Sequence, residues 1–519
     1  RTEKTAYRIL SGFGRVNYNY NMKYLLSFTA RYDGISRLKD NRWGFFPGVS
    51  VGWNIMEEDF WKESKVSDIV SNLKPRLSYG VNGNVNGIGN YEVYGEYAQV
   101  DAKTYGGATA LYNKKLLNTN LRWEQSQTFE VGLDIGFLQN RLSFILDFYS
   151  RRTKDLLTKQ ALPGYTGFSD IVTNMGTLRN SGFEAEVKAN IINKGGFTWD
   201  MTANITSVAN KIISLPYNNV ENNRVGGYEV AAGKVDADGK FPTKWIAGRQ
   251  EGGKLGELVG YRQQHVFKDW DDVKQHANLR VDEVANLYGP GLADQINPAT
   301  GKTYKESSGW QPIEPGDACW EDINGDNIIN GYDRSVMGNI FPNVTGGFST
   351  TFGYKGLSLY ARFDYALGHT LYNDLKARSL GQYQGQFNII TDVKDMWSEA
   401  NPNSDLTKFY YADQLAKKNI TRSNNASTAA DNNSSRYYEK GDYLALREIT
   451  LSYQLPKSLI SKAHLTEASV YVTGQNLFYI TGYDGVSPEP AVSTTYGRGI
   501  DNGRYPTPRT FLFGLSLTF

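Results

Sequence analysis

The segment SQTFEVGLDIGFLQNRLSFILDFYSR, residues 126–151, decides the fold, because it alternates apolar and polar residues on both sides of a short turn. Apolar residues take every second position of each half: Phe129, Val131, Leu133, Ile135 and Phe137, then Leu142, Phe144, Leu146 and Phe148. The positions between them include the charged residues Glu130, Asp134 and Asp147. Successive side chains of a strand point to opposite faces. The segment therefore predicts a hairpin through residues 138–140, with one apolar and one wet face.

The same two-residue period recurs along the chain and predicts thirteen strands. They lie near residues 9–20, 23–33, 45–55, 73–82, 126–137, 141–153, 180–192, 197–208, 344–353, 356–368, 443–454, 468–477 and 509–519. Strands of about ten residues can cross a bilayer when tilted. A soluble β-sandwich is the alternative, and it would bury its apolar faces in domains of about a hundred residues. The recurring charged face favours an all-β fold, a transmembrane antiparallel β-barrel with a polar lumen.

Composition excludes several other classes of protein. The 519 residues carry a net charge of +2, without the basic excess of a nucleic-acid-binding surface. Mean hydropathy is −0.49, and no apolar run approaches the roughly 18–20 residues of a transmembrane helix. The single Cys319 excludes an internal disulfide and a cysteine zinc cluster. Glu184 and Glu186 share one face of a predicted strand, but such a pair more often lines a wet lumen than catalyses hydrolysis, so no enzyme is predicted.

Short and long connections alternate along the chain. Very short turns follow the first, fifth, seventh and ninth strands, a short helix is predicted within 56–72, and the excursions at 209–343 and 369–442 are very long. Outer-membrane barrels keep short turns in the periplasm and long loops outside the cell. Thirteen strands then place residue 1 on the outer side, so at least one strand is expected upstream. Because an open sheet edge cannot persist in lipid, the missing strands are expected from another chain or from the front of the same gene product.

The last predicted strand ends the chain on an aromatic residue. Its alternate positions form one apolar stripe: Phe511, Phe513, Leu515, Leu517 and Phe519. An ordinary buried final strand could show the same pattern. A terminal aromatic residue at the membrane interface is also the feature that barrel-insertion machinery reads, and the stripe is predicted to be that C-terminal signal.

Several segments of this chain resemble SusC/RagA-type TonB-dependent transporters. They are YPTPRTF at 505–511, GLSLTF at 514–519, DYLALREITLSYQLP at 442–456, VTGQNLF at 472–478, NMGTLRNSGFE at 174–184 and NLKPRLSYG at 72–80. The resemblance implies a 22-stranded barrel in the outer membrane of a Gram-negative bacterium of the Bacteroidota type. It also implies an N-terminal plug, a TonB-box segment and a SusD-like surface lipoprotein as a lid, often in dimers of transporter–lipoprotein pairs. The plug and the TonB box have no counterpart in these residues, so residues 1–519 are interpreted as the C-terminal portion of the barrel.

The resemblance predicts TonB-dependent import of glycan or peptide nutrients. A siderophore or cobalamin receptor with the same barrel and no lipoprotein lid is one alternative. A non-transporting barrel scaffold in a surface assembly is another.

One segment, DINGDNIINGYD at 322–333, has the spacing of a calcium-binding loop. The ligand positions 1, 3, 5, 7 and 12 of an EF-hand-like loop fall on Asp322, Asn324, Asp326, the Ile328 carbonyl and Asp333. An Asn/Asp/Gly-rich turn without an ion is the alternative, since these residues favour turns. The prediction is a structural calcium ion, or another hard cation, that stiffens the 209–343 excursion.

Aromatic residues in the long loops are candidates for contact with substrate or lid. Trp310 and Trp320 are predicted in this role, although plain packing within the loops explains them equally well.

Overall fold

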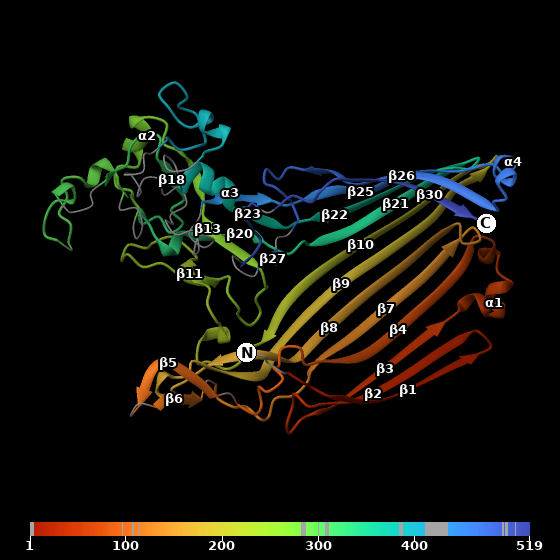
Figure 1. Ribbon diagram of the computed structural model, residues 1–519. Helices are drawn as coiled ribbons and strands as arrows, with labels where there is room; N and C mark the ends of the chain where they lie inside the picture. Colours follow the sequence, from red (N-terminus) through yellow and green to blue (C-terminus); the bar gives the residue numbers. More distant parts are fainter. Residues whose placement is uncertain are drawn as a thin grey trace.

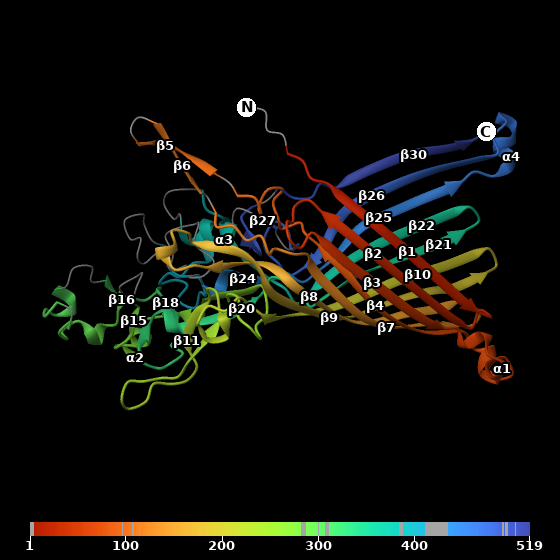
Figure 2. The ribbon, with the colours of Figure 1, turned by 90° about the horizontal axis from the view of Figure 1, so that it is seen from below.

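The computed structural model describes residues 5–95, 97–105, 108–113, 115–281, 287–298, 300–306, 311–382, 388–409, 434–489, 492–493, 497–503 and 505–519. Its main feature is one curved antiparallel sheet of thirteen strands (Figures 1 and 2). The strands in sheet order are β1 (Ile9–Tyr20), β2 (Tyr24–Ile35), β3 (Trp43–Trp53), β4 (Val70–Asn84), β7 (Glu124–Phe137), β8 (Leu142–Ala161), β9 (Asp170–Lys194), β10 (Phe197–Ser214), β21 (Val344–Tyr354), β22 (Leu357–Leu367), β25 (Tyr443–Gln454), β26 (Glu467–Thr481) and β30 (Thr510–Thr518). Each pairs with its neighbours in sequence order, and β1 and β30 form the two edges. The thirteen predicted strands and the all-β fold class are confirmed.

Tight turns at one end of the sheet set the register of the hairpins. Asn21 and Met22 have φ of 51° and 59°, and Lys355 and Gly356 have φ of 47° and 90°. Positive φ at both central residues is the type I′ geometry, whose twist matches that of the flanking strands. The turns therefore pair Tyr20 with Tyr24 and hold apolar positions opposite apolar positions across each hairpin.

The middle strands are longer than their alternation predicts. β8, β9 and β10 have 20, 25 and 18 residues, whereas a membrane-crossing strand needs about 9–11. At about 3.3 Å per residue, β9 extends to about 80 Å, far beyond the hydrocarbon thickness of about 30 Å. Register shifts around Leu156 interrupt the regular pairing of β8 with β9. The distal parts of these strands therefore belong with the loops.

Glycine lies directly opposite tyrosine at several positions of the sheet. Gly346 pairs with Tyr365, whose hydroxyl donates to the Asn204 carbonyl at 2.9 Å. A Cβ at Gly346 would lie 2.7 Å from the Tyr365 Cζ, so the ring lies over the missing side chain. Gly514 of the last strand pairs with Tyr471 in the same way. Aromatic rings thus cover the strand backbone where glycine leaves it bare.

The two ends of the sheet differ in size (Figure 1). The tight-turn end carries the C-terminus and two one-turn helices, α1 (Asp59–Lys62) and α4 (Lys457–Ile460). The short helix predicted within 56–72 corresponds to α1 and the 3-10 turns beside it. The loop end holds the other elements: β5 (Tyr97–Tyr105), β6 (Ala108–Asn113), β11 (Tyr228–Ala231), β12 (Thr243–Ile246), β13 (Glu257–Tyr261), β14 (Gln263–Val266), α2 (Trp270–Gln275), β15 (Arg280–Val281), β16 (Leu287–Tyr288), β17 (Gln311–Pro312), β18 (Ala318–Trp320), β19 (Ile328–Ile329), β20 (Arg334–Asn339), β23 (Thr370–Asn373), α3 (Asp374–Ala377), β24 (Tyr438–Lys440), β27 (Val492–Ser493), β28 (Gly497–Arg498) and β29 (Ile500–Asp501). None of the helices in the described ranges has the length and apolar character needed to cross a membrane.

The two long excursions pack into one loop domain, defined here as the described parts of 215–343 and 368–442. Its largest core contains Phe267, Val273, Cys319 and Ile329, each at most 1% exposed. The excursions are joined by hydrogen bonds: the Tyr438 hydroxyl donates to the Val259 carbonyl at 2.7 Å, and the Gln263 backbone donates to Ser435 at 3.0 Å. The loop domain thus has its own apolar interior and is a folded body at one end of the sheet.

Candidate functional site

An arginine-centred ion network lies on the polar face of the sheet. Arg76 of β4 contacts Asp134 of β7 through Nε at 2.9 Å and Asp147 of β8 through Nη2 at 2.9 Å. Glu130 lies 3.7 Å from the same guanidinium, and Lys74 lies 3.5 Å from Asp134. One guanidinium thus links three adjacent strands, as its planar fork of donors allows.

Gly132 makes room for this network. It lies on β7 between Arg76 and Asp147, paired with each in the register of the strands. A Cβ at Gly132 would lie 2.8 Å from the guanidinium carbon of Arg76 and closer still to Asp147. The glycine lets the arginine reach across one strand to the next, a role that the spacing of charges along the sequence does not reveal.

The predicted C-terminal stripe lies on the opposite, apolar face. All five of its residues are exposed, and in the pairing of β30 with β26 this face continues through Val472, Val470 and Ala468. The other face of the same strands carries Ser516 opposite Ser469. Exposed apolar side chains on one side and polar side chains on the other are what a wall between lipid and water requires. The role of the stripe in barrel insertion stays a prediction.

The predicted calcium-type loop is a compact turn within the loop domain. Asp322 accepts backbone hydrogen bonds from Gly325 at 2.6 Å and Asn327 at 2.8 Å. Asp333 accepts from the backbone of Ile323 at 2.9 Å and Asn330 at 2.8 Å. These bonds fold the ends of the loop towards each other, so that positions 1 and 12 approach.

Backbone conformation and packing fix the shape of this loop. Asn327 has φ of 63°, the left-handed conformation for which glycine is usual at this position. Ile329 is fully buried, and β19 pairs in parallel with β15, which anchors the loop in the core. Asn324 is fully buried as well, and its amide donates to Asp326 at 2.9 Å.

The loop concentrates three carboxylates, Asp322, Asp326 and Asp333. Burial raises the pKa of Asp333 to about 6, and repulsion from Asp322 and Asp326 adds to the effect. Three carboxylates and the buried Asn324 amide give the oxygen-rich donor set that a hard cation prefers. Across the described ranges, no three His, Cys, Asp or Glu side chains lie close enough to hold a metal by themselves. The three carboxylates therefore do not converge on one point in this structure, and calcium binding stays a prediction.

The two predicted contact tryptophans have different outcomes. Trp310 lies outside the described residues. Trp320 is 4% exposed and packs against Tyr261 in the core of the loop domain, with ring centroids 6.4 Å apart. A buried indole cannot stack on a ligand, so the prediction for Trp320 is wrong in this conformation, and the packing alternative holds.

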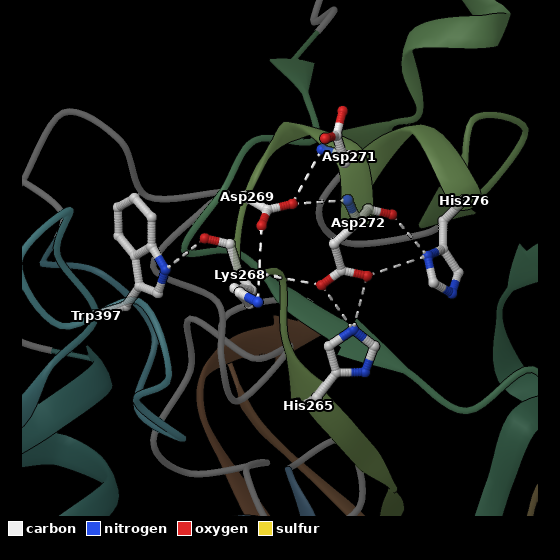
Figure 3. Close-up of polar contacts among 7 residues, drawn as sticks. All are labelled: His265, Lys268, Asp269, Asp271, Asp272, His276 and Trp397. Atoms are coloured by element: carbon white, nitrogen blue, oxygen red, sulfur yellow. Dashed lines mark hydrogen bonds and ion pairs between the residues drawn. The ribbon is translucent and has the colours of Figure 1, made fainter.

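A polar cluster that sequence analysis missed surrounds α2 (Figure 3). The Asp272 carboxylate lies 3.2 Å from Nε2 of His265 and accepts the Lys268 backbone N–H at 3.0 Å. His276 Nδ1 lies 3.1 Å from the Asp272 carbonyl. Asp269 caps the helix by accepting from the backbone N–H groups of Asp271 and Asp272. The sequence gives only one local sign of this cluster, an aspartate directly before an apolar helical position. The contact between His265 of β14 and Asp272 of α2 joins two separate elements and has no sequence signature.

Comparison with known proteins agrees with this architecture. A family profile described as TonB dependent receptor-like, beta-barrel matches residues 1–307. TonB-dependent receptor P3 of Formosa agariphila is 30% identical over 98% of this chain and 45% of its own length. TonB-dependent receptor SusC of Bacteroides thetaiotaomicron is 31% identical over the whole chain and 45% of its own length. The chain spans slightly less than half the length of the curated relatives it matches.

A solved structure shares the fold. The RagAB peptide transporter aligns with a TM-score of 0.71 over 99% of this chain and 48% of that chain, at 23% identity. That likeness covers the curved sheet and the bodies at its loop end together. With the profile match over more than half of the residues, the chain belongs to the TonB-dependent receptor family, as a SusC/RagA-like part of an outer-membrane β-barrel.

Proposed function

We propose that the protein containing this chain imports glycan or peptide nutrients across the outer membrane, driven by TonB and assisted by a SusD-like surface lipoprotein. The observation that carries the proposal is the polar face of the sheet, where Arg76, Asp134 and Asp147 form a charged lining. Such a lining is stable where water fills the barrel, and a water-filled barrel is a path for polar nutrients. One structural relative is named a peptide transporter, which is consistent with this class of cargo.

The unpaired edges of the sheet are part of the proposal. Within the described residues, β1 and β30 each pair on one side only. In lipid an unsatisfied backbone group costs several kcal/mol, so both edges need partners. We infer that further strands of the same gene product or of another chain close the wall, and that the loop domain faces the outside of the cell. A plug would block the barrel until TonB moves it and opens the polar path. The terminal stripe from Phe511 to Phe519 would then meet lipid and serve as the insertion signal.

The proposal is tested in the source bacterium by deleting the gene and measuring growth on defined glycans and peptides as sole nutrients. Growth on one nutrient class is expected to fail and to return on complementation. A detergent extract of the tagged protein is expected to yield a roughly equimolar lipoprotein by mass spectrometry. Unchanged growth on every nutrient, together with purification as a single polypeptide, would contradict both parts of the proposal.

We also propose that the 322–333 loop binds a structural calcium ion. Asp322, Asn324, Asp326, the Ile328 carbonyl and Asp333 would hold it, and its charge would offset the carboxylate repulsion. Its proposed contribution is to stiffen the long excursion between β10 and β21.

Removing calcium is expected to loosen this part of the loop domain. In the purified full-length protein, EGTA is expected to expose residues 209–343 to limited proteolysis, and 1 mM calcium to restore protection. Asp322→Asn combined with Asp326→Asn is expected to weaken calcium binding at least tenfold in calorimetry, because two of the anionic ligands become neutral. Asp238→Asn, at an exposed loop carboxylate, serves as the control. Identical proteolysis with and without EGTA would contradict the proposed calcium site.

A further inference from the structure

A pocket of about 450 Å³ lies where the two long excursions meet, and two tryptophans line it. Trp270 is the first residue of α2 and is 52% exposed, and Trp397 comes from the second excursion. Both belong to the long-loop aromatic residues that the sequence predicts as candidates for contact with substrate or lid, but only the fold brings these two, 127 positions apart, to one pocket. Its volume falls within the range of about 300–1,000 Å³ that is typical of small-molecule sites.

Trp397 is held in place by its surroundings. Its indole N–H donates to the Lys268 carbonyl at 3.1 Å (Figure 3). Its ring lies against Gly316, where an added Cβ would approach Cε3 to 2.6 Å. The Lys408 backbone donates to the Gly316 carbonyl at 2.9 Å, which ties the two excursions together beside the ring. A fixed aromatic face loses little conformational entropy on binding a ligand.

The other wall is fixed through α2. Asp269 caps this helix at the residue before Trp270, and Asp272 accepts the Lys268 backbone N–H and contacts His265 (Figure 3). These bonds fix the turn that carries Trp270. Hydrogen bonds therefore hold the backbone near both tryptophans in place. Preformed walls of this kind are typical of binding sites.

Three carboxylates and two lysines line the pocket: Asp269, Glu314 and Glu399, with Lys268 and Lys408. Lys408 pairs with Glu314 at 2.9 Å, and Lys268 lies 4.0 Å from Asp269. Glu399 leaves one carboxylate in excess, so the lining offers hydrogen-bond donors and acceptors beside two aromatic faces and is weakly negative. This excess of negative charge disfavours a phosphate, an acidic glycan or an acidic peptide. The two aromatic faces and the mixed polar groups suit a neutral ligand that combines an apolar face with many hydroxyl groups.

We propose that this pocket binds one or two sugar units of a neutral glycan, whose C–H faces stack on Trp270 and Trp397 while its hydroxyl groups bond to the carboxylates and ammonium groups around them. The site lies on the loop domain, apart from the sheet. The inference rests on the proposed import function and narrows its cargo to glycans.

The test uses the complete detergent-purified protein and an array of several hundred defined neutral and acidic oligosaccharides. Wild-type protein is expected to bind at least one neutral glycan. Trp270→Ala and Trp397→Ala are each expected to weaken that binding at least tenfold, whereas Trp270→Phe, which keeps an aromatic face, is expected to weaken it less than threefold. Tyr217→Ala, which removes an exposed aromatic side chain outside the pocket, is expected to change nothing.

Two results would overturn the glycan pocket. One is the absence of array binding by the wild-type protein. The other is glycan binding that survives both alanine substitutions. Uptake in cells separates this inference from the proposed function. If the Trp270→Ala strain imports nutrients normally and the Trp270→Ala protein binds the array as wild type does, the glycan pocket is contradicted and the import function is not. If the alanine variants lose array binding while the gene-deletion strain grows normally, the pocket is supported and the import function is contradicted.

Discussion

Leu515→Arg is expected to destabilise the folded barrel by about 2–4 kcal/mol, the cost of an arginine on the lipid face near the bilayer midplane. Leu515 lies near the middle of β30, is 61% exposed, and belongs to the apolar face that includes Val470 opposite it. The loss is to be measured in phospholipid vesicles as a lower denaturant midpoint of the heat-modifiable band in gel electrophoresis.

Ser516→Arg provides the matched control for this substitution. Ser516 is the next residue of the same strand and lies on the polar face, opposite Ser469. An arginine there would meet water, so its effect is expected to stay within about 0.5 kcal/mol, as for surface substitutions in general. Equal losses at the two positions would mean that the two faces of β30 see the same solvent.

Arg76→Leu is expected to cost about 2 kcal/mol of barrel stability. The change leaves Asp134 and Asp147 facing each other on neighbouring strands without their shared cation. Removing one partner of a fully buried ion pair costs about 3–5 kcal/mol. The value expected here is lower because the three side chains are 20–29% exposed, so water screens the repulsion between the two aspartates. The measurement is the denaturant midpoint of the full-length protein in vesicles, at low and at high salt.

Two further variants separate charge from simple loss of packing. Arg151→Leu removes an arginine of β8 whose guanidinium bonds to the neutral Thr128 at 3.2 Å, and it is expected to have little effect. Gly132→Ala keeps every charge but closes the path between Arg76 and Asp147, and it is expected to reproduce part of the Arg76→Leu loss. A stable Arg76→Leu protein, indistinguishable from wild type at low salt, would show that the network is not a stabilising feature of the wall.

The sheet was predictable from the sequence because the relevant physics is local. Alternation such as Phe129, Glu130, Val131 defines a strand and its two faces within a few residues, and short turns such as Asn21–Met22 define the partner. All thirteen strands of the sheet follow from these two signals. The extension of β9 to 25 residues does not, because beyond the membrane the strand packs against loops and no longer needs an apolar stripe.

The sites were predictable only where they are local in sequence. The 322–333 loop could be proposed from sequence because all its oxygen donors lie within twelve residues, and its calcium binding stays a prediction. Trp320 was misassigned because nothing near it in sequence shows that β18 is the centre of a core. The pocket of Trp270 and Trp397 and the role of Gly132 depend on contacts between distant segments, which residue type and spacing do not encode.

The central claim is that one face of this sheet meets hydrocarbon and the other meets water. Nitroxide labels on single cysteines at Thr128, Phe129, Glu130 and Val131 of β7 test it directly in bilayers. Burial raises the pKa of the Cys319 thiol to about 12, so that thiol stays protonated and escapes labelling at neutral pH. Labels at 129 and 131 are predicted to collide more often with oxygen, which concentrates in hydrocarbon. Labels at 128 and 130 are predicted to collide more often with a water-soluble nickel complex. Equal access of both reagents at all four positions, or protection of 129 and 131 from both, would contradict the account.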